Sequence, residues 1–219
     1  MTIAMKRKDY CRVFVWIYLP IILLLAILFV ISSLTGIPSS TFMSDPAVLI
    51  GEKGLFPFST DYKINPFASI ISQIGLLFWC STATVCLFTS YLSGCGNQRK
   101  YSPFLKYFGI FSLFLLFDDL LLFHESIAPK LLRTEKLVYV IYFVLFAFGT
   151  YKFRKNILTT NFFYFCLSIL FFALSILTDV FMPYSYIWLE DGLKIFGIAS
   201  WFSYFAITSF QIIQDLDAS

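Results

Sequence analysis

Residues 13–34 read VFVWIYLPIILLLAILFVISSL and contain no charged side chain. A transmembrane helix needs about 20 mostly apolar residues, because it rises about 1.5 Å per residue through a hydrocarbon core about 30 Å thick. The stretch is longer than the apolar region of about 7–15 residues in a secretory signal. It therefore predicts a retained first transmembrane helix.

The composition of the whole chain points the same way. Of its 219 residues, 59% are hydrophobic, 21% are aromatic and 13% are charged, whereas a soluble domain is roughly 45–50% apolar and about 25% charged. The core of a soluble protein with a chain of this length could not bury so much apolar surface. The composition excludes an ordinary soluble protein and predicts one integral membrane domain, in a cell membrane or a thylakoid membrane.

Uncharged runs recur along the chain, and they predict an all-α, polytopic bundle of six transmembrane helices. Ser102 is expected to cap the third helix, with Pro103 at its first helical position. A long outer loop should cover residues 35–65. The predicted spans are about 13–34, 66–92, 103–126, 136–151, 157–179 and 191–213.

The charged residues are segregated between the two sides of this predicted bundle. With six spans both termini share one side, and a cytoplasmic N-terminus places ten Lys and Arg residues inside, including Lys6, Arg7 and Lys8. The positive-inside rule therefore favours cytoplasmic N- and C-termini. Ten of the 13 acidic residues fall on or near the outer face, and this rule does not explain their position.

Residues 117–125, FDDLLLFHE, form the sharpest polar feature. An ionised Asp at a helix centre costs roughly 2.5–3.5 kcal/mol on insertion scales, so Asp118 and Asp119 should face the bundle and have partners. On a continuous helix, Glu125 shares the face of Asp118, while Asp119 and His124 flank that face. Asp179, at the end of the fifth span, should lie at the same level.

These residues are the candidate site, although no catalytic residue can be assigned from the sequence. One histidine among several carboxylates suits a hard or borderline divalent cation such as Mg, Mn, Ca, Fe or Zn, but whether a metal ion binds is left open. The candidate ligands or acid–base groups are Asp118, Asp119, His124, Glu125 and Asp179, surrounded by Glu135, Glu190, Asp191 and Lys194.

The residues leave four functions open. The main one is a membrane protein of unknown activity with an outward-facing, acidic, cation-binding site between the third and sixth spans. The others are a metal-dependent hydrolase acting on a lipid or amphiphile, a proton or cation transporter, and a non-catalytic subunit with a membrane-protein partner. Membrane lipids are the expected surroundings, and short basic loops without a basic domain disfavour nucleic-acid binding.

Polar and aromatic residues continue the acidic cluster inward along the last two spans. Spacings of three, four and seven place each set on one helical face, and small residues there allow close helix packing. Packing is favoured over a substrate path. The residues are Glu190, Lys194, Gly197, Trp201 and either Tyr204 or Ser203 on the sixth span, with Ser168, Ser175 and Asp179 on the fifth.

Two short motifs carry a family resemblance. One is the acidic pair Asp118-Asp119 followed by His124-Glu125, and the other is the segment 190–194, EDGLK, which opens the last span. In these motifs the chain resembles a loosely defined group of uncharacterised multi-pass membrane proteins of bacteria, cyanobacteria among them, over roughly residues 100 to 213. The resemblance implies a shared site on the outer face and no particular reaction.

Overall fold

The computed structural model describes residues 7–38, 40–43, 67–123, 136–181 and 187–217. No strand occurs among them, which confirms the all-α class. The elements are α1 (Arg7–Thr35), α2 (Ser40–Met43), α4 (Ile70–Cys95), the 3-10 helix η1 (Arg99–Tyr101), α5 (Ser102–Leu121), α7 (Lys136–Lys152), α8 (Arg154–Thr159), α9 (Phe162–Phe181) and α10 (Ile187–Asp217).

Four helices, α1, α4, α9 and α10, are long and apolar enough to cross a membrane. α5 has 20 residues but carries Lys106, Asp118 and Asp119, and α7 is apolar but has only 17 residues. By length and composition the structure therefore fits an integral membrane protein. Four of the six predicted spans thus correspond to helices that are long and apolar enough to cross a membrane.

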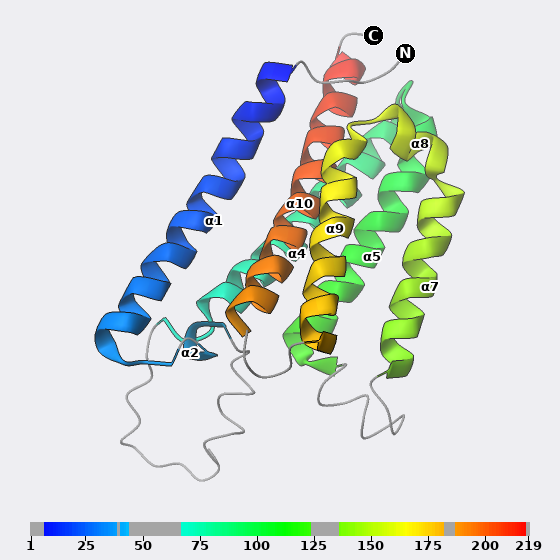
Figure 1. The fold of residues 1–219 in the computed structure, drawn as a ribbon. Helices are drawn as coiled ribbons and strands as arrows, with labels where there is room; N and C mark the ends of the chain where they lie inside the picture. The colour runs from blue at the N-terminus through cyan, green and yellow to red at the C-terminus, as the bar shows by residue number, and fades with distance from the viewer. Residues whose placement is uncertain (1–6, 39, 44–66, 124–135, 182–186, 218–219) are drawn as a thin grey trace, which may run out of the picture.

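α10 is the central helix of the bundle. It packs along α9 and α4, and α4 in turn packs along α5. Within its apolar stretch 67% of α10 is buried, compared with 17% of α1. Figure 1 shows α1 leaning away at one edge, α7 at the opposite edge, and α4 crossing obliquely behind α9 and α10. The start of α1 and the end of α10 lie at the same end of the bundle (Figure 1).

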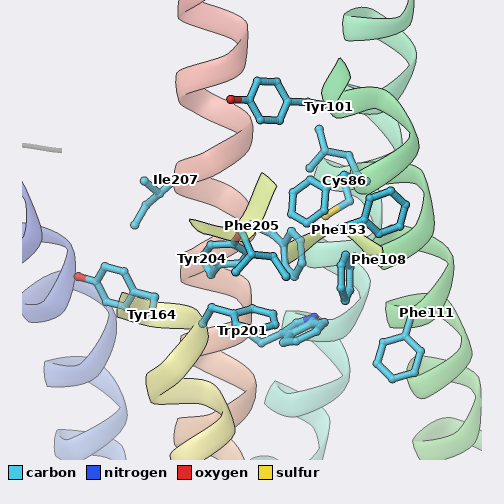
Figure 2. Close-up of a cluster of buried hydrophobic side chains, with 14 of the residues drawn as sticks. Cys86, Tyr101, Phe108, Phe111, Phe153, Tyr164, Trp201, Tyr204, Phe205 and Ile207 are labelled. Carbon is cyan, nitrogen blue, oxygen red and sulfur yellow. The ribbon is translucent and has the colours of Figure 1, made fainter. Parts of the chain in front are cut away.

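Aromatic rings fill the space between these helices (Figure 2). The ring centroid of Trp201 on α10 lies 5.7 Å from that of Phe108 on α5 and 5.7 Å from that of Phe165 on α9. Trp201 and Phe205 meet edge to face at 4.9 Å. Such tilted and T-shaped contacts add to the stabilisation from burying the rings. The abundant Phe therefore serves packing at the centre of the bundle as well as its exposed outer faces.

Gly109 allows α5 to approach α4 closely. A Cβ atom at Gly109 would lie 2.9 Å from Cγ of Leu87 and 3.0 Å from Cβ of Cys86. Real Cβ atoms essentially never come this close to other atoms. The absence of a side chain at Gly109 therefore allows the short distance between α4 and α5.

Two predicted spans break or end where the sequence does not predict it. The fifth predicted span, 157–179, is broken: α8 ends at Thr159, and α9 begins at Phe162. The backbone of Thr160 is extended, and its hydroxyl donates to the carbonyl oxygens of Asn156 and Ile157, which closes α8. α5 ends at Leu121 instead of continuing to 126, because Leu122 turns into the left-handed region at φ 48°.

Ser102 also differs from its expected role. It is the first residue of α5, with no side-chain cap at this end of the helix. Its hydroxyl lies 2.9 Å from the carbonyl oxygen of Ser90 on α4, to which it donates, while the Ser90 hydroxyl donates back to the Ser102 carbonyl at 2.9 Å. Ser102 therefore joins two helices. Of the predicted outer loop 35–65, residues 44–65 lie outside the described residues.

Candidate functional site

The carboxylate of Asp119 joins three helices. Trp79 on α4 donates its indole N–H to Oδ2 of Asp119 at 2.9 Å. The ammonium nitrogen of Lys194 on α10 lies 3.5 Å from Oδ1. The Asp119 side chain is 18% exposed and that of Lys194 is 40% exposed. We call Trp79, Asp119 and Lys194 the Asp119 clamp, because each carboxylate oxygen is held by a different helix.

Asp118 lies beside the clamp in the last turn of α5 and is only 5% exposed. Its backbone carbonyl accepts the N–H of Leu122, which ends the helix. The hydroxyl of Tyr142 on α7 is buried close to the Asp118 carboxylate. Since the negative end of the helix dipole opposes both aspartates, contacts with neighbouring helices must stabilise them.

The structure brings together only part of the predicted acidic cluster. Asp118 and Asp119 lie in one turn and face the bundle, as expected, whereas Asp179 is exposed on α9. α5 ends before His124 and Glu125, and these two residues and Glu135 lie outside the described residues. Within the described ranges, no three His, Cys, Asp or Glu side chains are grouped so that they could hold a metal ion.

Glu190, Asp191 and Lys194 lie where α10 begins, and all three are half-buried. The backbone carbonyl of Glu190 accepts a hydrogen bond from the hydroxyl of Ser175 on α9 at 3.1 Å. Lys194 reaches α5 through Asp119. The start of α10 is thus fixed to two helices, and Lys194 is part of the Asp119 clamp.

The sequence analysis missed Trp79 and Tyr142. A tryptophan within an apolar helix is a recognisable signal, because a buried indole N–H needs an acceptor, and the carboxylates of α5 are strong acceptors. Trp79 is 40 residues from Asp119 in the chain. The pairing depends on the oblique path of α4 across the bundle (Figure 1). This path cannot be predicted from the spacing of residues in the sequence.

The predicted stripe on the last two spans joins helices. Trp201 donates its indole N–H to the hydroxyl of Ser112 on α5 at 3.0 Å, and Tyr204 shares a hydrogen bond of 2.7 Å with Thr160. Ser168 on α9 donates to the carbonyl of Gly197 at 3.0 Å. These three groups each bond to another segment of the bundle, whereas the Ser203 hydroxyl donates to the carbonyl oxygen of Ala199 in its own helix. The hydrogen bonds between segments favour a packing role for this stripe.

Comparison with known families gives a match over more than half of the chain. A family model described as a domain of unknown function, DUF8692, matches residues 17–208. The chain belongs to this family. The match to DUF8692 runs from the first half of α1 into α10, so it includes every residue of the Asp119 clamp. It agrees with the expected membership of an uncharacterised family. No curated protein matches the chain, and no solved structure does.

Proposed function

We propose that the protein is a multi-pass integral membrane protein crossing the bilayer with α1, α4, α5, α7, α9 and α10. Four of these helices have the required length and apolarity. The edge helices carry large exposed apolar side chains, among them Trp16 on α1 at 72% and Phe143 on α7 at 70%. Soluble monomers rarely expose contiguous apolar surfaces of this kind. Lipid is the solvent that such faces require.

Within this setting the protein acts as a non-catalytic membrane component, a structural or assembly subunit whose charges pair internally. The observation that carries this proposal is the Asp119 clamp, in which a carboxylate of α5 is held by side chains of α4 and α10. The hydrogen bonds of Trp201, Tyr204 and Ser168 extend the same pattern along α10. Polar groups used in this way fix the arrangement of the helices.

Charge-removing variants of the full chain, purified in mild detergent, test this role. Asp119→Asn and Lys194→Gln should each lower the thermal unfolding temperature, and the double variant should lie close to the worse single variant because the two groups act as a pair. Metal chelators should not change the drop in unfolding temperature of either variant. If both variants unfold at the wild-type temperature, the structural role is wrong.

A cation or proton site at Asp118 and Asp119 is the second candidate function. The observation that favours it is the burial of Asp118, at 5% exposure, next to a second carboxylate. Acidic side chains inside a membrane bundle are typical of cation and proton pathways. In this proposal His124 and Glu125 complete a divalent-ion site with Asp118 and Asp119, and Asp179, which is exposed on α9, takes no part in it. A bound ion could activate water against a lipid or amphiphile.

Thermal unfolding with added Mg, Mn, Ca or Zn separates the two candidates. A cation site predicts a higher unfolding temperature with one of these ions, lost in Asp118→Asn but kept in Asp215→Asn, a half-buried aspartate near the other end of α10. Proteoliposomes with a pH-sensitive dye test the proton version. An absence of both the ion-dependent shift and the proton movement would leave the structural role as the better explanation.

A further inference from the structure

Six basic residues gather on two segments that contain no acidic residue. Residues 96–107 carry Arg99, Lys100 and Lys106, and residues 150–161 carry Lys152, Arg154 and Lys155. All six side chains are exposed. The segments include η1, the start of α5, the end of α7 and α8. We call these six residues the basic collar.

The two segments form one surface because α8 is tied to η1. The side-chain amide of Asn156 on α8 donates to the carbonyl oxygen of Lys100 at 3.3 Å. Phe153, between α7 and α8, lies 5.8 Å from Phe104 and 5.7 Å from Tyr107, measured between ring centroids. Figure 1 shows α8 beside the start of α5, at the end of the bundle where α1 begins. The collar is therefore held by packed side chains.

Aromatic rings lie beneath three of its cations. The Lys100 ammonium is 4.9 Å from the ring centroid of Tyr101, and the Arg154 guanidinium is 4.7 Å from that of Tyr151. The Lys152 ammonium is 5.5 Å from Phe148 and 5.4 Å from Phe153. Aromatic rings and the stems of long basic side chains both favour the boundary between hydrocarbon and headgroups. The three cation–ring contacts are of the kind found at that boundary.

We propose that the basic collar binds the phosphate headgroups of anionic phospholipids in the leaflet at this end of the bundle. Six positive charges on two segments that contain no acidic residue complement such a leaflet, and guanidinium groups bind phosphate oxygens in a bidentate manner. This inference rests on the membrane insertion proposed above. It adds a preference for one lipid class, carried by particular residues beyond the overall positive-inside bias.

Reconstitution of the full chain into vesicles tests this proposal. One set contains phosphatidylcholine alone and the other a mixture with phosphatidylglycerol. We expect a higher thermal unfolding temperature with phosphatidylglycerol. The variant Arg154→Gln/Lys155→Gln should lose at least half of this rise. The matched control Lys8→Gln/Arg12→Gln also removes two positive charges, here from α1, and should keep the full rise in unfolding temperature.

The outcomes separate the collar from simpler explanations. Equal unfolding temperatures of the wild type in both vesicles, or an equal loss in the control, would overturn the proposal. So would an equal rise when inorganic phosphate or a short RNA is added to phosphatidylcholine vesicles. Failure to enter either kind of vesicle would instead contradict the membrane insertion.

A salt titration of the wild type keeps the proposal testable if the α8 variant does not fold. Salt weakens attraction between exposed charges, and at 0.1 M it largely screens charges more than about 10 Å apart. The rise with phosphatidylglycerol should therefore shrink as NaCl is added. A rise that does not respond to salt would overturn the collar as its source.

Discussion

The indole nitrogen of Trp79 lies 2.9 Å from Oδ2 of Asp119, so that a residue in the first half of α4 holds the last turn of α5. The carboxylate keeps its other oxygen for Lys194 on α10. This division lets one acidic side chain define the positions of three helices. It also explains how an aspartate can be accommodated where the helix dipole opposes it.

Replacing Trp79 with Phe should destabilise the bundle. The ring remains large, but Oδ2 of Asp119 loses its donor, and an unsatisfied polar group of this kind costs about 1–3 kcal/mol. Thermal or denaturant unfolding of the full chain in detergent measures the change. Trp16→Phe is the matched control, because Trp16 is 72% exposed on α1. Similar losses for the two variants would contradict the importance of the hydrogen bond.

The contact between Trp201 and Ser112 should appear as an energetic coupling. Ser112→Ala leaves the buried Trp201 N–H without an acceptor, and residues in direct contact typically couple by about 0.5–3 kcal/mol. A double-mutant cycle with Trp201→Phe measures this coupling from unfolding free energies. Ser33→Ala, in which an exposed hydroxyl bonded within its own helix is removed, should change stability by less than about 0.5 kcal/mol. Strict additivity of Ser112→Ala and Trp201→Phe would rule out the coupling.

Helix content could be predicted from the sequence because the length of an apolar run is a local property. The break at Thr160 could not, since residues 157–161 contain no Pro or Gly. It depends on the extended backbone of Thr160 and on its hydroxyl, which also bonds Tyr204 on α10. The end of α5 could not be predicted either, because the left-handed turn that follows it is formed by Leu122 and not by a glycine.

The acidic character of the candidate site could be predicted from the sequence, but only some of the residues that form it. Asp118 and Asp179 have the same sequence signature, an acid near the C-terminal end of an apolar helix, yet Asp118 is buried and Asp179 is exposed. The face of α5 that carries the aspartates meets other helices, whereas α9 turns Asp179 outward. Which face of a helix is covered depends on tertiary packing, and the same holds for the pairing with Trp79.

Gly109→Ala should destabilise the contact between α4 and α5. The added Cβ would lie 3.0 Å from Cβ of Cys86, an atom close to the backbone that cannot move away easily. Overpacking of this kind costs typically about 1–3 kcal/mol. In the control Gly94→Ala, the new Cβ would meet only Ser102, at 3.4 Å and 4.0 Å, an ordinary contact. Unfolding of both variants checks the difference, and a neutral Gly109→Ala would mean that the two helices can separate without loss.

Cysteine labelling tests the proposed topology with residues that the chain already has. Cys95 is exposed at the end of α4, near the end of the bundle where α1 begins and α10 ends. Six crossings with cytoplasmic termini place it inside the cell. In a Cys11→Ser background, a membrane-impermeant maleimide should therefore label Cys95 only after the membrane is permeabilised. Cys95→Ser should abolish that labelling.

The opposite side can be probed with Glu52→Cys in a background that lacks both Cys11 and Cys95. Glu52 falls in the predicted outer loop 35–65, so the new thiol should be labelled in intact cells. Because α4 alone separates this loop from Cys95, the two positions must respond oppositely if α4 crosses the membrane. Labelling of both positions in intact cells, or of neither, would contradict the crossing by α4. Reversed accessibility of the two positions would keep the crossing and invert the orientation.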